Sequence, residues 1–88
     1  MTPKFDLGHV VSTVRVAQEV PRAEIISALR RHHSGDWGSL CSEDVQANDA
    51  ALNDGTRILS AYATSVGKIW IITEADRSVT TILYPSEY

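Results

Sequence analysis

Residues 68–73 read Lys-Ile-Trp-Ile-Ile-Thr, a run that is apolar at four successive positions. Successive side chains of a strand point to opposite faces, so Ile69 and Ile71 share one face. Trp70 and Ile72 share the other. A strand that is apolar on both faces is typical of a sheet interior with cover on each side. The run therefore predicts a central strand, and a second sheet face that needs cover from the chain itself or from a partner.

Two stretches with alternating apolar residues flank this run, at 57–64 and 79–84. The connections between the three stretches, 65–67 and 74–78, are too short for a crossover. The strands are therefore expected to pair antiparallel as a meander. A shorter apolar stretch at 7–12 is expected to form one further strand near the N-terminus.

Helical signals occupy the part of the chain between the first strand and the meander. Thr13 is expected to cap a short first helix. Pro21 suits the first turn of a second helix that runs to about His32, because its missing N–H has no partner there anyway. Ser42 is expected to cap a third helix, which Gly55 ends in the left-handed conformation. The expected order is β-α-α-α-β-β-β.

The sequence thus predicts an α+β fold in which the helices pack on one face of the sheet, as a single domain of residues 1–88. Hydrophobic residues make up 43% and charged residues 22%, as in ordinary globular proteins. The net charge of −3 disfavours nonspecific nucleic-acid binding, which depends on an excess of Lys and Arg. The single cysteine, Cys41, cannot form an internal disulfide, which favours a cytoplasmic location. No stretch approaches the roughly 18 apolar residues of a membrane span, so no membrane contact is expected.

Two short segments are candidate recognition elements. Asp36 and Trp37, between two glycines, either shape a ligand pocket or serve structure, with Asp36 bonding its own loop and Trp37 filling the core. Asn48 is either a polar clamp on a strand or on this loop, or a site residue. The charged hairpin turn at 74–78 is either a solvated turn or a recognition tip. Arg57 either joins Lys68, Arg77, Arg30 and Arg31 in a modest basic surface or, as the default, is an ordinary solvated surface residue.

Metal binding and catalysis have weaker support in the sequence. His32, His33, Asp36 and Cys41 are of ligand type, but zinc sites pair such residues twice and no second pair exists. The histidines are instead expected to end a helix, where a partial positive charge suits the dipole. Cys41 beside a histidine lacks a third, orienting group. We therefore expect no metal, no cofactor and no catalytic residue.

Two motifs give the chain a resemblance to a known family. They are Arg31-His32 followed by Gly-Asp-Trp-Gly at 35–38, and the run WIITEADRSVTTILYPSEY at 70–88. With them, nearly the whole chain resembles a family of small bacterial and phage proteins often labelled plasmid-related protein. Some members are labelled type I restriction methylation subunit. That label does not suit this sequence, because the glycine-rich cofactor loop and the Asn-Pro-Pro-aromatic motif of adenine methyltransferases are both missing.

The leading hypothesis is a non-catalytic, protein-binding accessory protein of a mobile genetic element, which inhibits or modulates a host defence complex of the restriction or CRISPR kind. Its partner is another protein or a second copy of the chain. Candidate binding residues are Asp36, Trp37, Asn48, Arg57, Tyr62, Glu74, Asp76, Arg77 and Tyr84. One alternative is a RelE-type toxin, which cuts messenger RNA with basic residues on its sheet. Another is a small-ligand-binding domain with a pocket beside Asp36 and Asn48.

Overall fold

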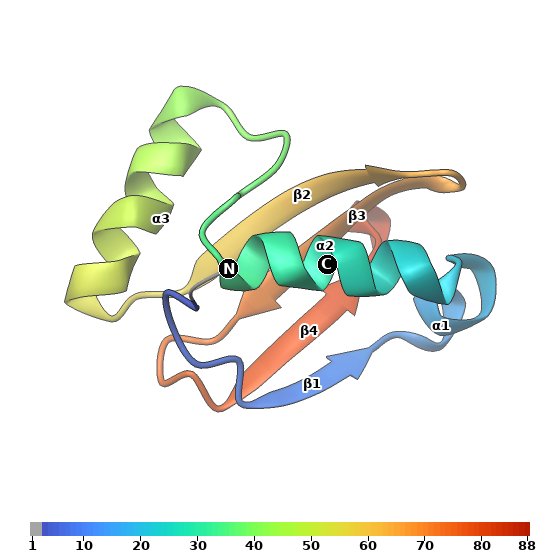
Figure 1. Cartoon of the computed structure of the whole chain (residues 1–88), viewed down its shortest axis with the longest axis horizontal. Helices are drawn as coiled ribbons and strands as arrows, with labels where there is room; N and C mark the ends of the chain where they lie inside the picture. The colour runs from blue at the N-terminus through green and yellow to red at the C-terminus, as the bar shows by residue number, and fades with distance from the viewer. Residues whose placement is uncertain (1–2) are drawn as a thin grey trace.

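Helices and strands combine in one layered unit, which a computed structural model describes for residues 3–88 (Figure 1). In chain order the elements are β1 (His9–Ser12), α1 (Val14–Glu19), α2 (Arg22–His33), α3 (Ser42–Asp54), β2 (Ile58–Thr64), β3 (Gly67–Thr73), β4 (Val79–Leu83) and the 3-10 turn η1 (Pro85–Glu87). The predicted α+β class is confirmed. None of the helices in this part of the chain has the length and apolar character needed to cross a bilayer.

The four strands form one mixed sheet in the order β1-β4-β3-β2. The strands β2, β3 and β4 pair antiparallel, as the short connections predict. The first strand, β1, joins the free edge of β4 in parallel, with His9 opposite Val79. The sheet therefore extends the expected three-stranded meander by a fourth strand, and β3 lies inside it.

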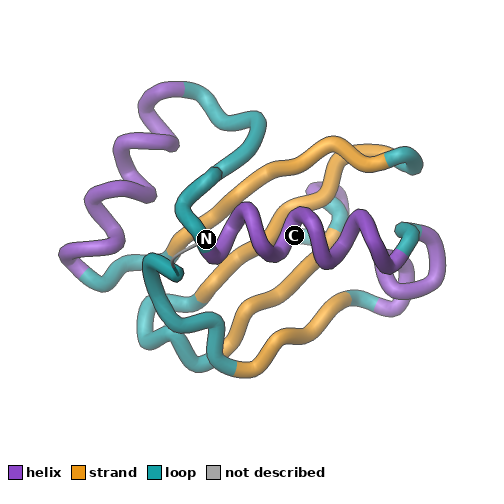
Figure 2. The backbone as a smooth tube through the Cα atoms, in the orientation of Figure 1, coloured by secondary structure: helices purple, strands orange, loops and turns teal. Residues whose placement is uncertain are grey.

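The helices α1 and α2 cover one face of the sheet, which we call the helix face (Figures 1 and 2). Their buried residues join the inward side chains of the strands in one hydrophobic core. That core contains Val16, Val20, Ala28, Tyr62, Ile69, Ile71, Ile82 and Tyr84. Cross-strand register places Ile71 between Ser60 and Ile82, so alternate residues of all three antiparallel strands share this face.

The opposite face, which we call the second face, carries Trp70 and Ile72 as predicted. The chain beyond β4 supplies part of its cover, since Tyr88 lies against Trp70 with ring centroids 5.6 Å apart. In contrast, α3 stands beside the β2 edge of the sheet (Figure 1). There Ala51 packs on Trp37 and Ile58 in a second, smaller core.

Local sequence signals account for most of the helix ends. The Thr13 hydroxyl accepts a hydrogen bond from the Val16 N–H at 3.3 Å, as expected for an N-cap. Gly55 ends α3 with φ of 75°, a left-handed conformation that favours glycine. The prediction that Ser42 caps α3 is wrong by one residue. The cap position belongs to Cys41, and Ser42 is already helical, while the Cys41 thiol donates to the Asp44 carboxylate at 3.3 Å.

Candidate functional site

The loop at 35–38 is fixed by hydrogen bonds within the chain. The Asp36 carboxylate accepts from Arg31 Nε at 2.8 Å, from Arg31 Nη2 at 3.3 Å and from the Gly38 N–H at 3.2 Å. Its backbone carbonyl accepts from the Tyr62 hydroxyl at 2.6 Å. The hydrogen bonds from Arg31 hold the pKa of Asp36 below its ordinary value. The polar groups of Asp36 and Tyr62 are therefore engaged with the protein itself.

Trp37 lies inside the molecule, with only 4% of its surface exposed. Its indole N–H donates to Asp49 Oδ1 at 2.9 Å, so the ring is fixed against α3. The following residue must be glycine, because a Cβ at Gly38 would collide with the Ala61 carbonyl oxygen and the Tyr62 ring. This close approach brings the loop against the outer edge of β2.

Asn48 clamps the same edge of β2. Its side-chain amide donates to the Leu59 carbonyl at 2.6 Å and accepts from the Leu59 N–H at 3.2 Å. Two residues further along this edge, the Ala61 N–H donates to the Trp37 carbonyl, and the Ala61 carbonyl accepts from the Ser39 N–H. These contacts satisfy backbone groups that an exposed edge strand would offer to other chains.

The hairpin turn at 74–78 is also tied to the rest of the fold. Arg77 has a φ of 61°, an uncommon value for a residue with a side chain. Its guanidinium donates to the carbonyl of Ala51 in α3 at 2.9 Å and to that of Glu74 at 3.1 Å. The Asp76 carboxylate accepts from the Ser78 hydroxyl at 2.6 Å and its N–H at 3.0 Å. Of the three charged candidates in the turn, Glu74 and Asp76 are exposed and Arg77 joins the turn to α3.

Tyr84 belongs to the helix face. Its hydroxyl donates to Glu19 at 2.7 Å, and Arg15 lies 4.8 Å from the ring centroid. The hydrogen bond to the Glu19 carboxylate raises the pKa of Tyr84. Tyr84 is therefore separated from the aromatic residue Tyr88, which lies on the second face.

A chain of buried polar side chains crosses the helix face beneath α2. The ring of His32 lies between two hydroxyls, with Nδ1 2.5 Å from Ser60 Oγ and Nε2 2.8 Å from Thr73 Oγ1. Thr73 then pairs with Thr80 at 2.7 Å, and the Thr80 hydroxyl donates to the Leu7 carbonyl at 2.7 Å. This network anchors the end of α2 to three strands.

His32 lies at the end of α2 as expected, but the expectation that its ring carries partial positive charge there is wrong. Burial, with a smaller effect of His33, lowers the pKa of His32 to about 3, so the ring is neutral. The Ser60–His32 pair has the composition of an activated nucleophile, but both side chains are fully buried and no substrate reaches them. The sequence signal for this network was the polar residues Ser60, Thr73 and Thr80, which stand at inward positions of the strands.

The expected basic surface divides into separate parts. Arg57 and Lys68 line the same hollow on the second face. Arg30 and Arg31 lie on α2, on the opposite side of the sheet. Arg77 is bonded to α3 and the turn. Of the five cations, Arg57 and Lys68 are the pair that shares the hollow on the second face.

The hollow on the second face has a volume of about 410 Å³. It lies between α3, the segment 39–41 and the strands β2 and β3, and it includes Leu59 and Trp70 with the two cations, Arg57 and Lys68. Tyr88 adjoins it, since the Arg57 guanidinium donates to the Tyr88 hydroxyl and lies 5.4 Å from its ring centroid. The sequence suggested that Arg57 and Lys68 lie near each other, but gave no sign that Trp70 and Tyr88 lie beside them.

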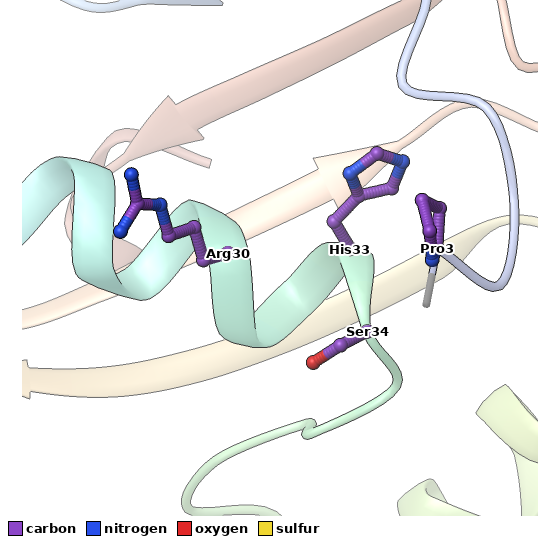
Figure 3. A pocket seen from close by; sticks show the side chains of 4 residues that line it. All are labelled: Pro3, Arg30, His33 and Ser34. Atoms are coloured by element: carbon purple, nitrogen blue, oxygen red, sulfur yellow. The ribbon is translucent and has the colours of Figure 1, made fainter. Parts of the chain in front are cut away.

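A second hollow, of about 300 Å³, lies at the C-terminal end of α2. It is lined by Pro3, Arg30, His33 and Ser34. Figure 3 shows the His33 ring beside Pro3, and Arg30 extending from the preceding turn of the helix. Its two basic side chains come from one exposed helix end, so it is less enclosed by separate elements than the hollow at Trp70.

The residues of metal-ligand type are dispersed. Within residues 3–88, no group of three or more His, Cys, Asp or Glu side chains is placed to hold a metal ion. His32 is buried among hydroxyls, whereas Cys41 is exposed beside the hollow on the second face.

Comparison of the chain with known proteins gave no match. No family model matches the sequence, no curated protein matches it, and no solved structure matches its fold. The case for a function therefore rests on the chain's own residues.

Proposed function

We propose that this chain is a non-catalytic binding protein that contacts a partner protein through its second face. The observation that carries the proposal is the difference in cover between the two sides of the sheet. Both α1 and α2 pack on the helix face, whereas the described part of the chain covers the second face mainly with the short segment after β4.

Ile72 and Leu83 on the second face are buried, but other apolar side chains of this face remain accessible. Val11 is 41% exposed, and Leu59, Trp70 and Val79 are half-buried. Cross-strand register places them on neighbouring strands of the same face. Tryptophan and arginine are residue types that protein interfaces favour, and Arg57 lies beside Trp70 at the hollow. A partner seated here would remove this apolar surface from water.

The biological setting is part of the same proposal. The resemblance to plasmid-related proteins of bacteria and phages supports a role in a mobile genetic element. We propose inhibition or modulation of a host defence complex, of the restriction or CRISPR kind, as the form that binding takes. Small proteins act in this way by occlusion, which requires an accessible surface and no catalytic group.

The test is affinity capture from a bacterial host lysate with paired charge variants. Val11→Glu combined with Lys68→Glu places two carboxylates on the second face. Arg22→Glu is the control, because Arg22 is exposed at the start of α2 on the other side. We expect the double variant to lose the captured protein and the control to retain it. Equal recovery by both variants would contradict the proposal.

Light scattering on the purified protein separates a foreign partner from a second copy. A monomer that captures a host protein supports binding of a foreign partner. A dimer that Val11→Glu with Lys68→Glu converts to a monomer assigns the second face to self-association instead. A dimer that the double variant leaves intact would place self-association elsewhere.

A further inference from the structure

We infer that the hollow on the second face binds an aromatic side chain flanked by acidic residues, presented by a segment of the partner protein, and that Tyr88 competes for Trp70 and Arg57 in the free protein. The inference rests on the proposed function and specifies the chemistry of the partner. Three features carry it, namely the contacts of Tyr88, the exposure of Tyr88 and the charges that line the hollow.

Tyr88 shows what the hollow's side chains recognise. Its ring meets Trp70 edge to face, with centroids 5.6 Å apart and an interplanar angle of 67°. The Arg57 guanidinium lies over the same ring, 5.4 Å from the centroid, and donates to its hydroxyl. Trp70 and Arg57 both line the hollow. An aromatic ring that carries a hydrogen-bond acceptor is thus already in contact with two of the residues that line this hollow.

Tyr88 is weakly retained in that place. Its surface is 64% exposed, so its contacts with Trp70 and Arg57 face water. Cation–π contacts contribute least at exposed sites, where the cation remains hydrated. An aromatic residue of a partner that also enters the hollow would bury more surface than Tyr88 does. It can therefore displace Tyr88 from Trp70.

The positive charges that line the hollow favour a partner segment with acidic residues next to its aromatic residue. Arg57 and Lys68 both line it, and the acid among its lining residues, Asp44, already accepts from the Cys41 thiol. The planar guanidinium of arginine suits a carboxylate, with which it forms paired hydrogen bonds. A segment with acidic residues beside its aromatic ring therefore complements this site.

A single-stranded RNA also offers rings and negative charge, but the geometry favours a peptide. Bases bind aromatic side chains by stacking on their faces, whereas Tyr88 meets Trp70 edge to face. The net charge of −3 opposes RNA, with a charge at every nucleotide, more than it opposes a short segment with a few carboxylates. RNA binding is therefore an outcome that the experiment must be able to detect.

The test titrates the full chain with a synthetic peptide in which one tyrosine is flanked on each side by two glutamates. Binding is followed by NMR through the two indole N–H signals. The Trp70 signal reports the hollow, and the Trp37 signal is an internal control because its N–H is bonded to Asp49. We expect a saturable shift of the Trp70 signal alone, and at least tenfold weaker binding of the peptide with alanine in place of tyrosine.

Protein variants separate the roles of the residues. Tyr88→Ala removes the internal competitor and is expected to tighten peptide binding at least threefold. Arg57→Gln is expected to weaken it at least tenfold, and Arg22→Gln on α2 to leave it unchanged. Thermal melts of each variant establish that it is folded. A merely structural role for Tyr88 predicts no gain in affinity when it is removed.

Two results would overturn the inference. One is an absence of saturable shift in both the parent and Tyr88→Ala. The other is tighter binding of oligouridine than of the peptide, which would assign the site to RNA. If the peptide fails while Val11→Glu with Lys68→Glu still abolishes capture of a partner protein, this inference fails and the proposed function stands. If the double variant also captures normally, both fail.

Discussion

The two faces of this sheet are built from the same three antiparallel strands, yet they use polar residues in opposite ways. On the helix face, His32 and Thr73 are fully buried and each finds hydrogen-bond partners beneath α2. On the second face, Arg57 and Lys68 are exposed and line a hollow beside Trp70. The helix face thus holds the fold together, and the second face keeps charged groups available.

Under the proposed function, this difference assigns folding stability to one face of the sheet and partner binding to the other. A buried polar group is costly unless it is fully hydrogen-bonded, so a change in the His32 network should act on folding. An exposed charged group contributes little to folding, so a change at Arg57 or Lys68 should act on binding. Paired substitutions on the two faces therefore test the assignment directly.

The largest contrast is expected between the two tryptophans. Trp37→Ala should lower the free energy of unfolding by about 3–5 kcal/mol, because it empties a closely packed site beside Ala51 and Ile58. Trp70→Ala should cost about 1–2 kcal/mol, because a half-buried ring loses less apolar contact. Urea denaturation measures both. Equal losses would mean that Trp70 on the second face is packed as closely as Trp37 in the smaller core.

The next effect concerns the edge of β2. Asn48→Ala should cost about 1–3 kcal/mol, since it leaves the N–H and carbonyl of Leu59 without their side-chain partners. Asn53→Ala on α3 is the matched control, because Asn53 is exposed, and a surface change of this kind should stay within about 0.5 kcal/mol. If the two variants melt alike, the clamp contributes nothing to stability.

Local and periodic features of the fold were predictable from the sequence. The alternation along 68–73 separated Ile69 and Ile71 from Trp70 and Ile72 correctly, because side-chain direction in a strand follows position alone. Thr13 and Gly55 marked helix ends through their own backbone and side-chain chemistry. These signals need no knowledge of distant residues.

Contacts between distant segments were not predictable in the same way. The parallel pairing of β1 with β4 depends on tertiary packing. The four residues of β1 contain no local pattern that predicts which strand they pair with. His32 ends a helix in either environment, and only the inward hydroxyls of β2 and β3 show that it is buried. The sequence around Arg77 predicts an exposed turn residue, and its hydrogen bond to the Ala51 carbonyl depends on where α3 lies in the fold.

The stability of the helix face should depend on pH through His32. Burial lowers the pKa of this ring from 6.5 to about 3, so the folded state keeps it neutral. Below pH 6.5 the unfolded chain binds the proton first. The free energy of unfolding should then fall by up to about 1.4 kcal/mol per pH unit as the pH drops toward the folded pKa.

The control for this pH effect is His32→Gln, which does not titrate. We compare the two proteins between pH 6.5 and about 5, above the range where carboxylates usually take up protons. Over this range the slope of unfolding free energy against pH should be smaller in the variant, because one proton fewer is taken up on unfolding. Urea titrations at several pH values measure the difference. An identical pH dependence in the two proteins would show that His32 is protonated in the folded state.

The smallest and most specific contrast comes from two neighbouring threonines. Thr80 is fully buried on the helix face and bonds to Thr73 and to the Leu7 carbonyl, whereas Thr81 is half-exposed on the second face. Thr80→Val preserves the shape of the side chain but removes its hydrogen bonds, which should cost about 1 kcal/mol. Thr81→Val makes the same chemical change one residue later and should alter stability by less than about 0.5 kcal/mol. The substitution, the strand and the β-propensity are the same in both variants. The difference between the two melts therefore measures the effect of the face on which the threonine lies. Equal costs would contradict the division between a face that stabilises the fold and a face that is available for binding.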